Sequence, residues 1–186
     1  MKRKKSSGRK NQQLLLDQSF KFKRYFGGTL LKNSNAKTAR PISTKEAMHI
    51  VMRSSLAKGK HSMLQKNLAH KIRMTIDMQA KRFHVKVYEF ANVGNHIHLL
   101  VRASHRDLFK GFLRAISGLI ARISLGVERG CAKALKFWDQ RPFTRIVSWK
   151  RDFEGVKKYV VQNFNEAMGF IPFTPRKYMS KYISTA

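Results

Sequence analysis

The chain has 186 residues, 42% of them apolar, so one domain of ordinary size can bury a hydrophobic core. Its 39 lysines and arginines against 10 acidic residues give a formal net charge of +29, which favours a polyanionic partner such as a nucleic acid. A single cysteine excludes a disulfide framework and a thiolate zinc cluster, and no apolar run approaches the roughly 18 residues of a membrane span.

The distribution of the basic residues along the chain favours nucleic acid over the other negatively charged partners. A membrane surface or an acidic protein would be met by one amphipathic face or one tail, whereas here lysines and arginines run through the whole chain. The basic residues 1–5 are not followed by an apolar stretch of signal-peptide length. We therefore expect a soluble, cytoplasmic protein.

Residues 1–43 are predicted to form a basic, largely flexible arm. Residues 1–40 hold twelve lysines and arginines and one acid, Asp17, a charge of +11, and they show no sustained helical or strand period. The aromatic and basic residues that alternate from Phe20 to Phe26 suit base stacking with phosphate binding, and equally a local docking onto the folded domain. The alternative for the whole arm is a solvated tail that only aids solubility or non-specific contact with DNA.

From about residue 44 the pattern is that of a folded domain, which we expect to span residues 44–170, with a tail at 171–186. The predicted elements are a strand at 47–54, a helix at 62–80, strands at 83–91 and 95–102, a helix at 107–126, a strand at 144–148 and a helix at 152–168. Apolar residues three and four apart indicate the helices, and alternation indicates the strands.

Turn and capping residues set the expected boundaries. Gly94 supplies a turn between two strands, which predicts an antiparallel hairpin. Asp107 and Asp152 are expected N-caps, and Gly126 and Gly169 are placed to end the corresponding helices. The order β-α-β-β-α-β-α is that of an α+β, ferredoxin-like fold, an antiparallel sheet with helices on one face plus a C-terminal helix.

Two histidines share one face of an otherwise apolar strand. Successive side chains of a strand point to opposite faces, so His96 and His98 project together while Ile97, Leu99 and Val101 project to the other side. Neutral imidazole is the commonest side-chain ligand for divalent metals, and the pair therefore indicates half of a metal site. The alternative is one histidine satisfied by a backbone carbonyl and another that is partly exposed.

The last predicted helix presents a phenol and an amide on the same side. Tyr159 and Asn163 are four residues apart and lie one above the other on a helix surface. They lie beside the expected packing row, which consists of Val156, Val160, Phe164 and Ala167. The alternative is an ordinary half-buried tyrosine with a chance neighbour.

Three motifs in this order resemble the HUH-type single-tyrosine transposases, and the REP-associated tyrosine transposases are the most similar branch. The motifs are NHIHLLV at 95–101, WDQRPF at 138–143 and DFEGVKKYVVQN at 152–163. The similarity covers roughly residues 44–170 and implies the same ferredoxin-like fold. Residues 164–169 depart from the Pro-Val-Arg-Ala-Gly-like run of that branch.

The resemblance implies metal-dependent cleavage and rejoining of single-stranded DNA. It assigns His96, His98 and Asn163 as metal ligands and Tyr159 as the nucleophile, and it implies a bacterial protein associated with the nucleoid. Gln162, one residue off the helix face of Tyr159 and Asn163, is an alternative third ligand. Two nitrogens and one amide oxygen suit Mg²⁺ or Mn²⁺. The ion would polarise the scissile phosphate, and attack by the phenol would give a 5′-phosphotyrosine and a free 3′-OH.

The expected partner is single-stranded or hairpin DNA, bound by a monomer or a homodimer. The candidate DNA-binding residues are Lys21, Lys23, Arg24, Arg102, Lys157 and Lys158. One alternative is a nucleic-acid-binding protein without catalysis, a domesticated hairpin binder or an RNA binder. Another is a metal-dependent nuclease in which water replaces the tyrosine.

Overall fold

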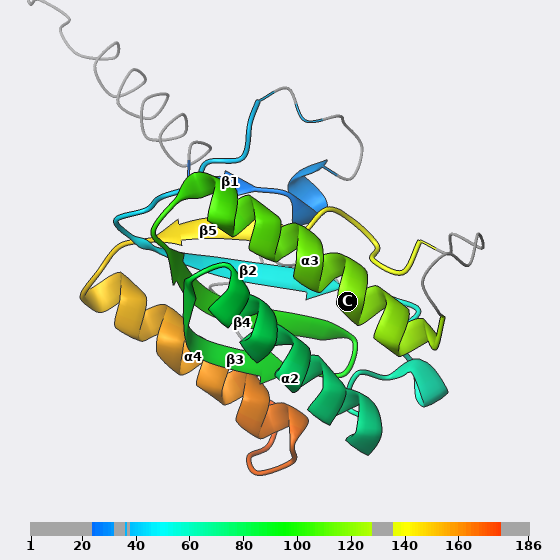
Figure 1. Ribbon diagram of the computed structural model, residues 1–186. Helices are drawn as coiled ribbons and strands as arrows, with labels where there is room; N and C mark the ends of the chain where they lie inside the picture. Colours follow the sequence, from blue (N-terminus) through cyan, green and yellow to red (C-terminus); the bar gives the residue numbers. More distant parts are fainter. Residues whose placement is uncertain (1–23, 32–35, 37, 128–135, 176–186) are drawn as a thin grey trace, which may run out of the picture.

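One antiparallel sheet of five strands organises the fold (Figure 1). The structure is a computed structural model, and it describes residues 24–31, 36, 38–127 and 136–175. In chain order its elements are β1 (Tyr25–Phe26), η1 (Gly28–Leu31), β2 (Ala47–Arg53), η2 (Gly59–His61), α2 (Lys66–Arg82), β3 (Val85–Asn92), β4 (His96–Ala103), α3 (Arg106–Leu125), β5 (Phe143–Val147) and α4 (Arg151–Ala167). The strand order across the sheet is β1-β5-β2-β4-β3, and every neighbouring pair is antiparallel.

The predicted fold class is confirmed. The seven long elements follow one another as β-α-β-β-α-β-α, and the two-residue β1 adds an edge strand next to β5. The hairpin expected around Gly94 is formed by β3 and β4. Gly94 has a φ of 89°, a left-handed conformation that glycine adopts without the steric cost of a Cβ.

Alternation along β4 sends its side chains into two separate cores. Ile97, Leu99 and Val101 belong to the larger core, which α2 and α3 cover. Leu100 belongs to a smaller core together with Val156 and other residues of α4. The helix α4 therefore covers the sheet face opposite α2 and α3, and burial of each such side chain stabilises the fold by about 1.5–3 kcal/mol.

Two predicted boundaries were wrong by a few residues, in both cases because of local backbone conformation. The helix predicted at 62–80 begins only at Lys66, since the preceding residues form η2 and a turn. The strand predicted at 83–91 begins at Val85, because α2 continues to Arg82 and His84 has a positive φ of 50°. A residue in that conformation cannot continue either a helix or a strand.

The N-caps predicted at Asp107 and Asp152 were also wrong. The capping positions are His105 and Lys150, and both aspartates lie in the first helical turn. Negative charge is favourable there because it faces the positive end of the helix dipole. Asp152 also accepts the backbone N–H of Ser148 at 3.1 Å, which fastens the start of α4 to the end of β5.

The predicted helix stops are confirmed. Gly126 ends α3 with a φ of 64°, and Gly169 follows the end of α4 with a φ of 74°. Both values lie in the left-handed region, which favours glycine after a helix.

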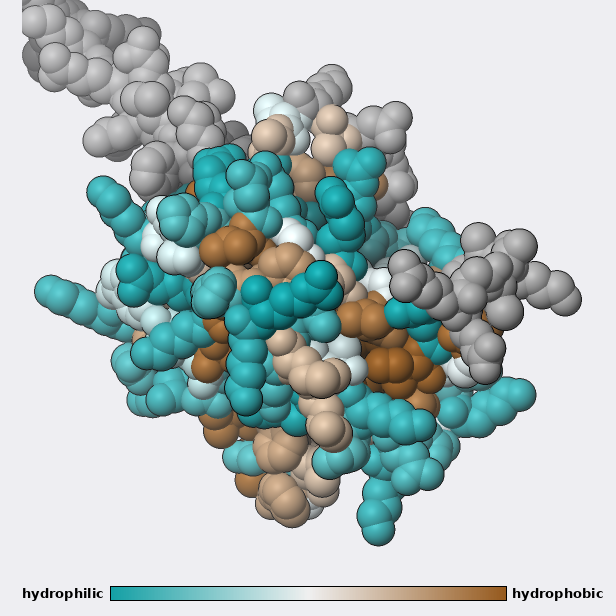
Figure 2. All heavy atoms as spheres, viewed as in Figure 1, coloured by the Kyte–Doolittle hydropathy of each residue, from teal (hydrophilic) through white to brown (hydrophobic). Residues whose placement is uncertain are grey.

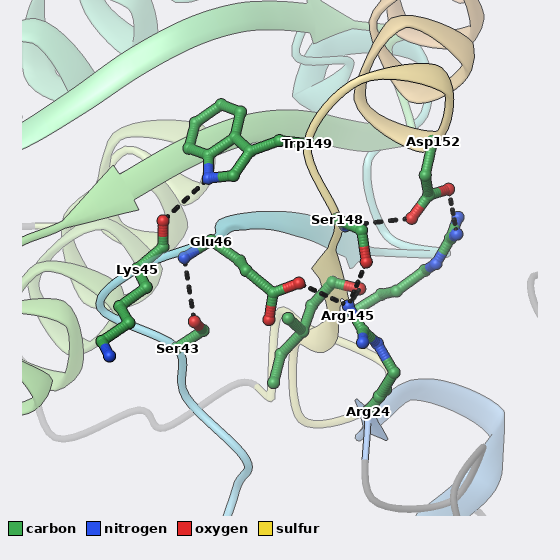
Figure 3. Close-up of polar contacts among 9 residues, drawn as sticks. Arg24, Ser43, Lys45, Glu46, Arg145, Ser148, Trp149 and Asp152 are labelled. Carbon is green, nitrogen blue, oxygen red and sulfur yellow. Dashed lines mark hydrogen bonds and ion pairs between the residues drawn. The ribbon is translucent and has the colours of Figure 1, made fainter.

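Part of the expected N-terminal arm lies against the sheet. Tyr25–Phe26 pairs with β5 as β1. Arg24 donates to the Glu46 carboxylate at 2.9 Å and to the Ser148 hydroxyl at 2.8 Å (Figure 3). The Arg40 guanidinium lies over the Phe26 ring, 4.4 Å from its centroid. Residues 1–23, 32–35 and 37 of the arm lie outside the described residues.

The surface over α2 and α3 is mostly hydrophilic, with apolar side chains between the charged ones (Figure 2). Within the described ranges no helix combines the length and the apolar character needed to cross a bilayer.

Candidate active site

The two histidines predicted to share a face do so. Both lie on β4, between β2 and β3, and project toward α4 rather than into the larger core. His98 is fully buried and His96 is half-buried at the start of the strand. Their rings meet edge to face, with centroids 4.8 Å apart. Alternation along the strand therefore places both imidazoles beneath the C-terminal helix.

Tyr159 lies directly over these histidines. Its ring is edge-on to His98, with centroids 5.4 Å apart and an interplanar angle of 88°. The cause is the packing of α4, because Val156 and Val160 are buried against the sheet and turn the neighbouring side chain toward the histidines. Tyr159 itself is half-buried. The packing of α4 thus brings the phenol to the imidazoles, although they are about 60 residues apart in the chain.

A third histidine, which the sequence reading missed, completes this cluster. His49 on β2 is fully buried, and its Nε2 lies 3.3 Å from His98 Nδ1. The two rings are nearly parallel, at 9°, and the Tyr159 ring is edge-on to His49 at 6.0 Å. Burial, followed by the nearby charge of Arg145, lowers the His49 pKa to about 3, so this imidazole is neutral at physiological pH. Alternation in AMHIVMR was the signal, since it puts His49 on the face opposite Met48 and Ile50.

The side chains of Asn163 and Gln162 differ in burial and in their hydrogen-bond partners. Asn163 is buried, and its Nδ2 donates to the Tyr159 carbonyl one turn earlier, at 2.6 Å. Because the nitrogen donates in this bond, Oδ1 is the atom through which this side chain would bind a cation. Gln162 instead donates to Glu166 at 2.9 Å and lines a groove with Lys158 and Val161.

The hydrogen bond between His96 and the Asn95 side chain indicates which ring nitrogen of His96 carries the proton. His96 Nδ1 lies 2.6 Å from Asn95 Oδ1, and an amide oxygen can only accept a hydrogen bond. Nδ1 therefore carries the proton, and Nε2 has the lone pair that a metal would use. Asn95 belongs to the same motif but was not singled out in the sequence.

The donor set fits a divalent ion with oxygen-rich coordination. Two imidazole nitrogens and an amide oxygen leave other positions for phosphate oxygens and water, as a catalytic site requires. Within the described parts of the chain, no three His, Cys, Asp or Glu side chains gather as a metal site. The third donor that the resemblance implies is the amide of Asn163, and this role stays a prediction.

The candidate DNA-binding residues that the structure describes lie on β4, on α4 and just before β1. Arg102 is exposed on β4 and lies over the half-exposed Trp149, 6.0 Å from its ring centroid. Lys157 is 3.6 Å from the Glu89 carboxylate, and Lys158 is exposed on α4. Arg24 is held in the ion pair with Glu46 shown in Figure 3. Two further candidates, Lys21 and Lys23, lie outside the described residues.

A fold of this class with a tyrosine over paired histidines agrees with the family comparison. Residues 43–163, more than half of the chain, match the family model described as "Transposase IS200 like". The chain belongs to this family, which confirms the resemblance of its motifs to transposases. It is therefore a transposase, an enzyme that cleaves and rejoins DNA. A comparison with curated proteins found no match.

The first of two similar solved structures supports the fold. The structure of a REP-associated tyrosine transposase bound to a REP hairpin is similar, with a TM-score of 0.56 and 13% sequence identity. The alignment covers 74% of this chain and 76% of that chain. A candidate transposase from Deinococcus radiodurans R1 gives a TM-score of 0.41 and 13% identity, over 69% of this chain and 98% of that chain.

Proposed function

We propose that this transposase nicks and rejoins single-stranded or hairpin-bearing DNA through a covalent bond to Tyr159. The observation that carries the proposal is the position of the Tyr159 ring, which lies edge-on to both His98 and His49 on the same face of the sheet. A phenol is a weak nucleophile at neutral pH, and its attack on a phosphodiester is easier when the charge on the phosphate is neutralised. The imidazoles of His96 and His98 beneath the tyrosine are suited to hold a cation that provides this neutralisation.

His96, His98 and Asn163 would hold Mg²⁺ or Mn²⁺. The ion supplies Lewis-acid polarisation of the phosphate oxygens when bound. The Tyr159 oxygen forms a bond to phosphorus and loses its proton, while the bond from phosphorus to the 3′ oxygen breaks and that oxygen takes up a proton. The products are a 5′-phosphotyrosine and a 3′-OH. Attack by a 3′-OH on the phosphotyrosine reverses the step and rejoins DNA without an external energy source.

Arg102 is the DNA contact that the structure supports best. Residues 96, 98, 100 and 102 project to the same side of β4, so Arg102 lies about 13 Å along the strand from His98. The exposed fraction of Trp149 is 39%, and its indole N–H donates to the Lys45 carbonyl at 2.9 Å, which holds the ring in place (Figure 3). A guanidinium beside a fixed aromatic ring suits a phosphate and its neighbouring base.

The experiment that tests the proposal is a search for the covalent intermediate. The protein is incubated with hairpin-bearing single-stranded DNA and Mn²⁺, and the products are separated in SDS. We expect an adduct of protein and DNA that survives denaturation and disappears with protease. Binding without an adduct would favour the non-catalytic binder, and cleavage without an adduct would favour a nuclease that uses water.

Arg102→Ala is expected to weaken binding of single-stranded DNA without abolishing the adduct at saturating DNA. Loss of one phosphate contact should reduce the slope of log affinity against log salt by about 0.7. Fluorescence anisotropy across a salt series measures this slope. Arg114→Ala, an exposed arginine on α3 at the opposite sheet face, is the matched control, and an equal change in both variants would contradict the assignment.

Deletion of residues 1–23 is expected to lower DNA affinity and flatten its salt dependence while the chemistry survives. This segment holds eight lysines and arginines and one acid, a charge of +7. The truncation ends before Arg24, because Arg24 and β1 are bonded to the domain. An unchanged salt slope would show that the arm is no DNA contact. A truncated protein that is saturated with DNA yet inactive would show that the arm completes the active site.

A further inference from the structure

The buried side chain of His49 makes its hydrogen-bond contact with another histidine, His98. It is fully buried on β2, its ring is stacked on His98, and its Nε2 lies 3.3 Å from His98 Nδ1. Its other ring nitrogen, Nδ1, is buried and has no hydrogen-bond partner among the described residues. A buried polar atom without a partner destabilises a fold, so a purely structural role would be better served by an apolar side chain.

The hydrogen bond between the two rings has only two arrangements when both imidazoles are neutral. In one arrangement His49 Nε2–H donates, and His98 must then carry its own proton on Nε2. In the other, His98 Nδ1–H donates to His49 Nε2, and the lone pair of His98 lies on Nε2. Only the second arrangement leaves His98 Nε2 deprotonated, as metal coordination requires.

We propose that His49 is a positioning residue, whose Nε2 accepts a hydrogen bond from His98 Nδ1–H and thereby directs the His98 Nε2 lone pair to the catalytic ion. This inference rests on the proposed role of His98 as a metal ligand. A metal-bound histidine almost always donates its other ring N–H to a second group, usually a carboxylate or a carbonyl. In this proposal that second group is His49 on β2. Here the His49 imidazole takes that place, because its Nε2 is the atom that lies 3.3 Å from His98 Nδ1.

The register of the sheet explains why the pair forms. In the antiparallel pairing of β2 with β4, Val51 lies opposite His98 and His49 lies opposite Leu100. His49 and His98 are therefore diagonal neighbours on one face, a distance that two stacked rings can span. The same face carries Tyr159 above both rings, so one buried side chain contacts the nucleophile and a proposed ligand.

Two variants of His49 separate positioning from packing. His49→Phe keeps a flat ring but removes the acceptor, whereas His49→Gln supplies an amide oxygen that can accept from His98. We expect Mn²⁺ affinity, measured by calorimetry on the DNA-free protein, to fall about 10–100-fold in His49→Phe. His49→Gln should stay within a few-fold of the wild type. Thermal unfolding of each variant shows whether it is folded at the titration temperature.

The tautomer itself is measured in the wild type, so the test survives even if a variant fails to fold. Nitrogen NMR of the imidazoles with saturating Mg²⁺ should show the proton of His98 on Nδ1. A proton on Nε2, unchanged Mn²⁺ affinity in a folded His49→Phe, or equal losses in both variants would overturn the inference. If the wild type binds no Mn²⁺, or His98→Ala binds it as tightly, the proposed metal site fails instead.

Discussion

Tyr159→Phe is expected to abolish the covalent adduct entirely while hairpin binding stays within a few-fold of the wild type. The substitution removes only the phenolic oxygen, which is the atom that would bond to phosphorus. The ring and its edge contacts with His98 and His49 are retained, so the fold should be unaffected. Separation of labelled DNA and protein in SDS measures the adduct, and anisotropy measures binding.

Tyr88→Phe is the matched control for this prediction. Tyr88 lies on β3 and packs against Trp149 and Phe153, away from the three histidines. This variant should form as much adduct as the wild type. An adduct that persists in Tyr159→Phe would show that another tyrosine is the nucleophile, and the proposed mechanism would then be wrong.

His96→Ala is expected to abolish cleavage and to weaken Mn²⁺ binding by more than about 100-fold, a larger loss than that of a typical outer-shell partner. The proposed role of His96 is direct coordination through Nε2, and alanine offers no donor in its place. Because His96 is only half-buried, loss of its ring should cost little stability. Calorimetric titration with Mn²⁺ measures the affinity, and the melting temperature measures the stability.

His98→Ala should show the same loss of metal binding together with a larger loss of stability. His98 is fully buried, so alanine leaves a cavity and removes the partner of His49. His70→Ala, an exposed histidine of α2 on the opposite sheet face, should change neither quantity. Unchanged Mn²⁺ affinity in His96→Ala would favour structural histidines, the alternative that the sequence left open.

Local patterns in the sequence were sufficient for the elements and for part of the site. Alternation in NHIHLLV placed His96 and His98 on one face, and helical spacing placed Asn163 one turn beyond Tyr159, because both periods depend only on backbone geometry. The order of strands and helices was enough to indicate the fold class. The errors lay at boundaries, as at His84, whose positive φ no local propensity announces.

What only the tertiary structure decided is which of these segments meet. The antiparallel register of β2 with β4 stacks His49 on His98, although 49 residues separate them in the chain. Burial of Val156 and Val160 turns Tyr159 onto the histidines and leaves Gln162 bonded to Glu166 in the groove on α4. Strand register and helix docking are set by contacts between distant segments, whose burial energies depend on the whole core rather than on any local pattern. The sequence by itself therefore determined the candidate ligands and nucleophile, and the packing of β2, β4 and α4 determined that Tyr159 lies over the histidines.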